Sequence, residues 1–313
     1  MSESANDHGA LIHIRTSRRL VLPCLLLGAF AVAPATSQAA LYGFSEQQPE
    51  MFTNPLYQDL SKVKIARYIA PYDVATDARD KAIFDRWYAA ARADKQRVLV
   101  SFYYDRDRPL KLPSTKLYTS KMKAFKKAYP KITEISPYNE ANRDARKQRR
   151  FAGPSAKQAA NYYLAARKVF KGKKYKIVGL DLLDGNSIKP SIKYLKAFQR
   201  YTRKHPNKIW GLHNYSDTNR NSTKRTKAVL AQVKGEVWLT ETGGLVKLGT
   251  SFAYSEARAA RALKNMFKLA SNKRIKRLYI YQWSPGDDQF DAGLIGKDGS
   301  PRPGYDVVKK KLG

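Results

Sequence analysis

Two glutamates stand where their side chains could do chemistry together. Glu140 lies in "PYNEAN" (137–142) and Glu241 in "LTETGG" (239–244), and each follows a run with strand-like composition. Two carboxyl groups that face each other across a cavity can hydrolyse a glycosidic bond. One donates a proton to the leaving oxygen, while the other attacks the anomeric carbon or activates a water molecule. The sequence therefore predicts Glu140 and Glu241 as a catalytic pair.

The two roles require different surroundings. A proton donor must hold its proton near neutral pH, which needs a raised pKa, whereas a nucleophile must stay ionised and needs hydrogen-bond donors or a nearby cation. We therefore expect Glu140, as the acid and base, to lack a close cation. Glu241, as the nucleophile, should have Arg67, His213 or Tyr215 within hydrogen-bonding reach, because these residues lie on two other predicted strands.

The predicted substrate-binding residues are Asn139, Arg67, His213, Tyr215 and Trp283. Asn139 directly precedes Glu140 and is expected to bind a sugar hydroxyl, and Trp283 in "YQWSP" offers a flat apolar face to a sugar ring. Structural interpretations compete with these roles. Arg67 is alternatively an ion-pair partner inside the fold, His213 a buried histidine with satisfied hydrogen bonds, and Trp283 a packing residue.

Other acids also follow predicted strands, although the chain has 59 Lys and Arg against 26 Asp and Glu. They are Glu46, Asp73, Asp105, Asp181 or Asp184, Asp217, and Asp287 or Asp288. Aspartate at such a point commonly caps a helix or forms a turn, so local structure is the favoured interpretation of each aspartate. Glutamate is a poor cap, and Glu140 and Glu241 are therefore harder to assign to local structure.

The segments that must position these residues alternate between two patterns. Eight strand-like runs end in polar residues: 40–47, 63–73, 96–105, 131–140, 175–184, 208–217, 236–244 and 277–288. Helical patterns occupy 80–95, 155–170, 191–204, 256–270 and 304–312. This alternation over about 270 residues predicts a single (β/α)8 barrel, whose strand ends share one face. The rival is an open doubly wound sheet, which usually has a glycine-rich loop after its first strand, and "SEQQPEMF" (45–52) has no glycine.

These motifs resemble those of glycoside hydrolase clan A, the retaining (β/α)8 hydrolases. In that clan an Asn-Glu pair ends the fourth strand and a second glutamate ends the seventh, as Asn139-Glu140 and Glu241 do here. The resemblance implies a glycosidase with Glu140 as acid and base and Glu241 as nucleophile. Many relatives read Trp-Asn-Glu-Pro where this chain has Tyr138-Asn139-Glu140-Ala141, which leaves the family within the clan open.

The resemblance extends to the residues around the pair. Clan members often have His or Tyr on the sixth strand, tryptophan on the eighth and arginine on the second, which matches "HNY" (213–215), Trp283 and Arg67. It covers nearly the whole chain after the N-terminal segment.

The first 39 residues have the pattern of a secretion signal. A basic segment at 15–19 precedes an apolar run at 20–33, and small residues at 37 and 39 suit a cleavage site. The apolar run is shorter than a usual membrane span, although an uncleaved anchor is the alternative. We therefore predict a signal peptide at 1–39, a glycoside hydrolase-like domain at 40–313, and a secreted protein with no stable membrane insertion after cleavage.

Metal or cofactor chemistry has little support in the sequence. The only cysteine, Cys24, and two of the four histidines, His8 and His13, lie within the predicted signal. The remaining residues show no spacing that suits the three or four ligands of a zinc site. We predict no metal and no cofactor.

The formal net charge of +33 raises the question of an anionic partner. For a secreted protein this would be an anionic cell-wall polymer or an acidic polysaccharide, and the alternative is an ordinary solvated surface. We predict no binding to nucleic acid, because no groove-reading element or RNA-binding aromatic motif is present. The favoured function is a monomeric, secreted polysaccharide hydrolase associated with the cell wall. The alternative is a catalytically inactive barrel that binds anionic cell-wall glycan through its basic surface.

Overall fold

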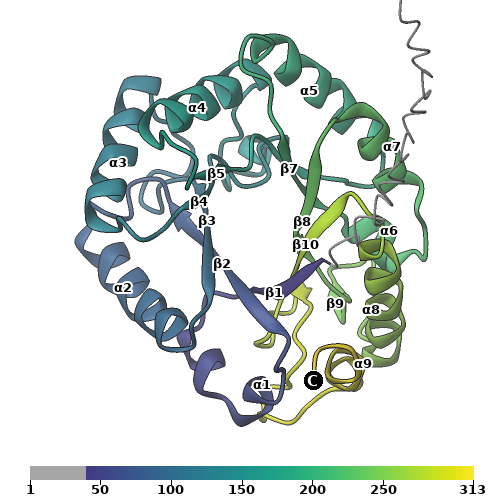
Figure 1. The fold of residues 1–313 in the computed structure, drawn as a ribbon. Helices are drawn as coiled ribbons and strands as arrows, with labels where there is room; N and C mark the ends of the chain where they lie inside the picture. Colours follow the sequence, from purple (N-terminus) through teal and green to yellow (C-terminus); the bar gives the residue numbers. More distant parts are fainter. Residues whose placement is uncertain (1–39) are drawn as a thin grey trace, which may run out of the picture. The chain divides into compact units, whose positions relative to one another are not determined.

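The computed structural model describes residues 40–313, and the predicted signal peptide lies outside the described residues. A parallel sheet has the strand order β5-β4-β3-β2-β1-β10-β8-β7-β6, and Figure 1 shows it inside a ring of helices. Its strands are β1 (Leu41–Ser45), β2 (Val63–Pro71), β3 (Arg97–Tyr103), β4 (Glu134–Ser136), β5 (Lys176–Ile177), β6 (Asp181–Leu183), β7 (Ile209–His213), β8 (Glu236–Thr242) and β10 (Ile275–Ile280).

The sheet closes into a barrel because its two edge strands belong to one segment. Only residues 178–180 separate β5 from β6. On one side of this segment the Val178 N–H donates to the Ile135 carbonyl in β4, and on the other side the Gly211 N–H in β7 donates to the Leu180 carbonyl, both at 2.9 Å. β5 and β6 together therefore form the fifth strand of an eight-stranded barrel. The predicted (β/α)8 fold is confirmed, and each predicted run overlaps a barrel strand.

The helices that surround the barrel are α2 (Ala78–Ala93), α3 (Thr115–Ala128), α4 (Ala156–Val169), α5 (Ile188–Tyr201), α7 (Lys224–Gln232), α8 (Glu256–Ala270) and α9 (Pro303–Leu312). Shorter elements are η1 (Pro49–Thr53), α1 (Pro55–Gln58), η2 (Arg146–Gln148), α6 (Tyr215–Asn219) and an antiparallel pair of β9 (Lys247–Leu248) with β11 (Phe290–Asp291). The Ser155 side chain accepts the Gln158 N–H and so caps the start of α4. No helix within residues 40–313 is long and apolar enough to cross a membrane.

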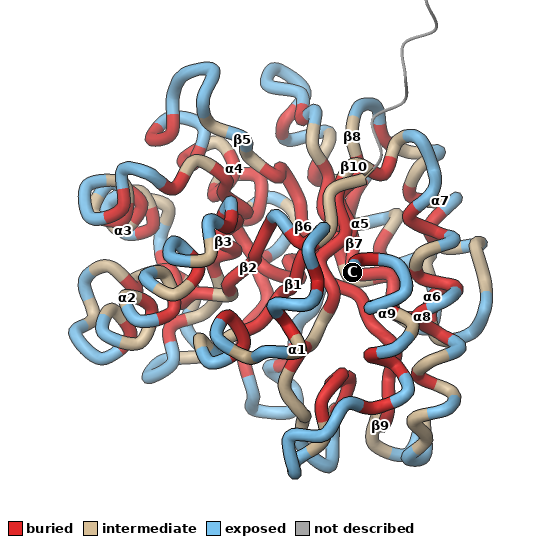
Figure 2. The backbone as a smooth tube through the Cα atoms, turned by 60° about the horizontal axis from the view of Figure 1, so that its bottom comes forward, coloured by how far each residue is buried: buried red, intermediate tan, exposed pale blue. Residues whose placement is uncertain are grey.

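Buried apolar side chains in residues 40–313 form three clusters, of which the smallest combines Tyr215, Leu245 and Ala292. The largest cluster lies mainly between strands and helices and includes Trp87, and another combines Ile65, Leu99, Val178, Trp238 and Tyr279. Figure 2 shows most of the central strands buried, with exposed residues concentrated on the helices and loops around them. Within the barrel, Arg277 pairs with Glu134 and its guanidinium lies 3.7 Å from the centre of the Trp238 ring. The barrel interior is thus a packed core that includes the buried Arg277–Glu134 ion pair, in which Glu134 is the first residue of β4.

Candidate active site

Glu140 and Glu241 meet at the face formed by the carboxyl ends of the strands. Glu241 is the second-last residue of β8, and Glu140 lies in the turn after β4. Both side chains are buried. One carboxylate oxygen of each glutamate and one ring nitrogen of His213 all lie within 4.8 Å of one another. The structure therefore brings together the two residues that the sequence paired.

The turn that carries Glu140 is held on both sides. The backbone of Glu140 has a φ of +42°, which is uncommon for a residue other than glycine. The N–H of Asn139 donates to the Phe102 carbonyl at 2.7 Å, and the N–H of Ala141 donates to the Asp181 carbonyl at 3.1 Å. Because these bonds tie the turn to the strands on either side, the chain can hold Glu140 in this conformation.

Both oxygens of Glu241 accept hydrogen bonds. Arg67, fully buried in β2, donates from Nη1 to Glu241 Oε2 at 2.7 Å, and the Tyr215 hydroxyl donates to Oε1 at 3.1 Å. Arg67 also donates to the side chains of Ser45 and Asn139. The predicted contacts of Glu241 with Arg67 and Tyr215 are confirmed, and they fix the orientation of its carboxylate. The ion-pair interpretation of Arg67 is also correct, because its contact with Glu241 is an ion pair between two buried side chains.

Asp181 in β6 belongs to the site, although the sequence did not select it as a site residue. Its carboxylate is fully buried and accepts hydrogen bonds from Arg67, Ser101, Ser136 and Thr240. Burial alone would raise the pKa of Asp181, but the charge and hydrogen bond of His213, followed by the charge of Arg67, hold it well below its usual range. Asp181 is therefore a permanent negative charge next to Arg67 and His213, which contact Glu241 and Glu140. The available signal was its place inside the strand-like run "GLDLLD" (179–184), where barrel geometry directs one side chain inward.

His213 connects three carboxylates. Its Nε2 lies 3.2 Å from Asp181 Oδ1, and its Nδ1 lies 3.1 Å from Glu140 Oε1 and 3.8 Å from Glu241 Oε1. Gly211 leaves room for this arrangement, because a Cβ there would approach Asp181 Oδ1 to 2.2 Å. Burial would lower the pKa of His213, but the charges of Glu241 and Asp181 and the hydrogen bonds raise it to about 10. The imidazole is therefore protonated at neutral pH, and both ring nitrogens donate.

This raised pKa couples folding stability to pH. His213 titrates near 6.5 when unfolded, so its stabilising contribution is complete below pH 6.5 and is lost as the pH rises toward about 10. We expect the free energy of unfolding of the protein to fall over this range by at most about 1.4 kcal/mol per pH unit for one proton. The His213→Gln variant should lose this part of the slope. Urea unfolding at several pH values checks the prediction, and parallel curves for the two proteins would contradict it.

The expectation that Glu140 lacks a close cation is wrong. Arg143, three residues further along the same turn, places Nη1 at 2.8 Å from Glu140 Oε2. Its guanidinium also lies 5.2 Å from the centre of the Phe151 ring, which supports this orientation. Burial would raise the pKa of Glu140, but the hydrogen bond and charge of His213, together with Arg143, lower it to about 2. Glu140 is thus ionised in the substrate-free protein.

Several other acids at strand ends serve local structure, as expected for the aspartates. Asp105 accepts the backbone N–H groups of Asp107 and Arg108. Asp184 accepts the backbone N–H groups of Ser216 and Asp217 at the start of α6. Glu46, after β1, is also structural, because it accepts the N–H groups of Gln47, Gln48, Trp283 and Ser284. It therefore joins the ends of β1 and β10.

The geometry of Trp283 favours its packing interpretation. The side chain is 3% exposed, and its ring packs edge-on against Phe44, Tyr57 and Tyr305. Tyr281 and Phe290 are half-buried, and their ring centres lie 5.7 Å apart. Phe290 also contacts the ring of Tyr215 at 5.7 Å. These two rings, which the sequence did not single out, are more exposed than Trp283 and lie next to Tyr215.

The cluster of Glu140, His213 and Glu241 is compact enough to hold a metal ion, so its electrostatics must be considered. Arg67 already donates to Glu241, Arg143 donates to Glu140, and His213 is itself positive. A metal ion would have to displace these donors against three positive charges. The surroundings therefore fit a hydrogen-bonded carboxylate pair better than a metal centre.

A closed (β/α)8 barrel with glutamates meeting from the ends of its fourth and seventh strands has the architecture of the clan A glycoside hydrolases. The chain belongs to the glycosyl hydrolase catalytic core family, whose model matches residues 113–303. The resemblance to clan A is thereby confirmed, and the protein is a glycosidase by family.

Several solved structures share the fold. A GH10 endoxylanase retrieved from a sugarcane soil metagenome is 12% identical with a TM-score of 0.61, covering 88% of this chain and 97% of that chain. The GH53 catalytic domain of Ignisphaera aggregans is 14% identical with a TM-score of 0.60, covering 86% and 95%. A GH128 endo-β-1,3-glucanase from Pseudomonas viridiflava is 13% identical with a TM-score of 0.58, covering 87% and 97%. A sequence search of curated proteins finds no match.

Proposed function

We propose that this protein is a secreted retaining glycoside hydrolase that cleaves O-glycosidic bonds within a polysaccharide. The observation that carries the proposal is the approach of Glu140 and Glu241, whose nearest carboxylate oxygens lie within 4.8 Å. Retaining enzymes hold their carboxyl groups about 5–5.5 Å apart, whereas inverting enzymes need about 6.5–9.5 Å to admit a water molecule. The fold neighbours named endoxylanase and endo-β-1,3-glucanase support a polysaccharide substrate.

In the first step Glu241 acts as the nucleophile. One of its oxygens attacks the anomeric carbon, the bond from that carbon to the glycosidic oxygen breaks, and Glu140 donates a proton to the departing oxygen. The product is a glycosyl ester on Glu241. Arg67 and Tyr215 orient the attacking carboxylate, because each donates to one of its oxygens.

In the second step a water molecule attacks the same carbon from the side that the leaving group vacated. Glu140, now ionised, removes a proton from this water, and Glu241 departs as a carboxylate. Two inversions at one carbon give net retention. Glu140 has a low pKa in the substrate-free protein, which makes it a weak base. Bound substrate must therefore change the surroundings of Glu140 so that its pKa rises.

The contacts of Glu140 indicate how it obtains its proton. His213 donates through Nδ1 to Glu140 Oε1 at 3.1 Å, so transfer of that proton makes Glu140 an acid and leaves the imidazole neutral. Arg143 opposes this transfer, but its side chain is 43% exposed and can turn toward solvent when a sugar enters. Excluding water then raises the pKa of Glu140, because burial already acts in that direction.

Sugar binding is assigned to polar and aromatic groups next to the pair. Asn139 accepts from Arg67 through Oδ1, and its amide nitrogen has no hydrogen-bond partner among residues 40–313, so it can donate to a sugar hydroxyl. Tyr281 and Phe290 supply the apolar faces. We further propose that the domain at 40–313 acts as a monomer outside the cell, after removal of the signal at 1–39, in contact with the cell wall.

The experiment that tests this function is incubation with a panel of neutral and acidic polysaccharides, with the configuration of the first released sugar followed by proton NMR. We expect cleavage of at least one polymer with retention. Absence of cleavage across the panel, or a product of inverted configuration, would count against the proposal.

A further inference from the structure

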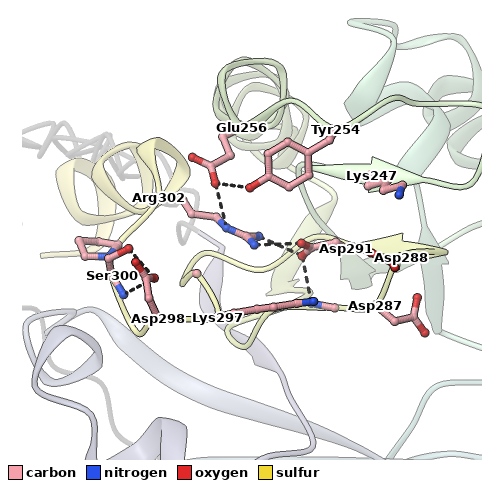
Figure 3. Close-up of a pocket in the computed structure, with 13 residues that line it drawn as sticks. Lys247, Tyr254, Glu256, Asp287, Asp288, Asp291, Lys297, Asp298, Ser300 and Arg302 are labelled. Carbon is pink, nitrogen blue, oxygen red and sulfur yellow. Dashed lines mark hydrogen bonds and ion pairs between the residues drawn. The ribbon is translucent and has the colours of Figure 1, made fainter.

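Two pockets outside the catalytic centre differ in how their charges are balanced. The first, of about 470 Å³, lies beside the β9–β11 pair and contains both acids and bases (Figure 3). There Arg302 lies between Asp291 and Glu256, with nitrogen–oxygen distances of 3.0 Å and 3.2 Å. The charge of Arg302 is compensated in this way, and the lining contains more acids than bases, so this pocket does not favour an anion.

The second pocket, which we term the α6–α8 groove, is lined by bases without acids. It has a volume of about 540 Å³, and its charged lining residues are Arg220, Arg258, Arg261, Lys264 and Lys268. None of these five forms an ion pair with a carboxylate anywhere in residues 40–313. Uncompensated like charges repel, and a bound anion would relieve that repulsion.

Two of these arginines are held in place before any ligand arrives. The guanidinium groups of Arg220 and Arg258 each lie 4.9 Å from the centre of the Phe252 ring. Arg258 also donates to the backbone carbonyls of Leu245 and Val246, while its buried Nε has no partner. Burial and the nearby charge of Arg261 lower the pKa of Arg258. Fixed guanidinium groups bind carboxylates well, because their planar N–H forks match the two oxygens.

The groove begins close to the catalytic face. α6 opens with Tyr215, which donates to Glu241, and ends at Asn219, which lines the groove, and Figure 1 shows α6 beside α8. The bases on α8 recur every three or four residues and so share one side of the helix. From Arg258 to Lys268 they span about 15 Å at 1.5 Å per residue. This row suits a polymer with repeated charges.

We propose that the α6–α8 groove binds the carboxylate groups of an acidic polysaccharide next to the catalytic face. Binding at the groove is independent of catalysis, whereas the identification of that polymer as the substrate rests on the proposed function. The groove favours a polyuronic acid over a nucleic acid, because the described residues that line it include no aromatic ring on which bases could stack. The neighbouring Phe252 ring is already covered by the guanidinium groups of Arg220 and Arg258.

The test measures binding of polygalacturonate by titration calorimetry in the Glu241→Gln background, so that hydrolysis does not interfere. The groove variant is Arg261→Glu/Lys264→Glu/Lys268→Glu, which reverses three exposed charges on α8. We expect its affinity to fall by about tenfold or more, since each exposed ion pair contributes a modest amount and three are reversed. If this variant fails to fold, the corresponding triple glutamine variant replaces it.

A matched control separates the groove from the general charge of the protein. Lys171→Glu/Lys173→Glu/Lys174→Glu makes the same change in net charge in the exposed segment before β5. We expect the control to keep its affinity within about twofold, because charges more than roughly 10 Å apart are largely screened at 0.1 M salt. A neutral glucan should bind both triple variants equally.

Three results would overturn the proposal: equal losses in the groove and control variants, equal binding of polygalacturonate and neutral glucan, or tighter binding of nucleic acid than of polygalacturonate at the same salt concentration. The hydrolysis panel gives an independent result. Binding in the groove without cleavage of any polymer would reject the proposed catalytic function and leave the groove assignment intact.

Discussion

Replacing Glu241 with glutamine is expected to lower kcat by on the order of 10⁴-fold or more, because an amide cannot form the glycosyl ester. The glutamine side chain is nearly the same size as the native one, and its carbonyl oxygen could still accept a hydrogen bond from Arg67. Arg67 also keeps its contacts with Asp181 and Asn139, so the barrel should remain folded. Activity on the polymer identified from the panel and circular dichroism of the purified variant measure the two effects.

Glu236→Gln is the matched control for this substitution. Glu236 begins β8, five positions before Glu241 on the same strand, and its carboxylate accepts only the Trp238 indole N–H in the described chain. Its activity should stay within about twofold of the native protein, because the change is far from the catalytic face. A comparable loss of activity in both variants would mean that damage to strand β8, rather than removal of the Glu241 carboxylate, causes the loss.

Replacing Glu140 with alanine is expected to have an effect that depends on the leaving group. General acid catalysis contributes about 10²–10⁴-fold, so hydrolysis of the natural polymer should fall by roughly that factor. Aryl glycosides with acidic phenols should lose little in the first step, since a good leaving group needs no proton. Release of the phenol in a rapid first turnover, measured by absorbance, checks this expectation.

The second step of the Glu140 variant provides an independent check. Without a base, water attacks the glycosyl ester slowly, whereas azide needs no deprotonation and should accelerate turnover. The product should be a glycosyl azide with the configuration of the substrate. A uniform loss for all leaving groups, with no response to azide, would show that Glu140 does not transfer the proton.

Much of this site could be predicted because barrel topology converts sequence order into position. The ends of the fourth and seventh strands share one face, so Glu140 and Glu241 could be paired from their place in the run of strands. Arg67 and Tyr215 follow from the same argument, and both contact Glu241.

The remaining features depend on geometry that strand order does not encode. The Arg143 contact arises because the chain turns at Glu140, where φ is +42°, and returns the side chain three residues later to the same carboxylate. Asp181 reaches the centre because β5 and β6 together form the fifth barrel strand and Gly211 in the next strand leaves space for the Asp181 carboxylate. Trp283 was assigned to the sugar from its position, but contacts with the surrounding aromatic residues place it in the core. The helices α3 and α7 also received no clear sequence signal.

The most direct test of the central claim is the configuration of the sugar at the moment of its release. The reaction is run in an NMR tube with enough enzyme to outpace mutarotation, and the anomeric proton of the new reducing end is recorded from the first minute. With Glu241 as nucleophile and Glu140 as acid and base, the first signal should belong to the anomer that matches the cleaved linkage, and the other anomer should appear later by mutarotation. If the opposite anomer appears first, a water molecule has attacked directly, and the assigned roles of Glu140 and Glu241 are wrong even if both residues are essential.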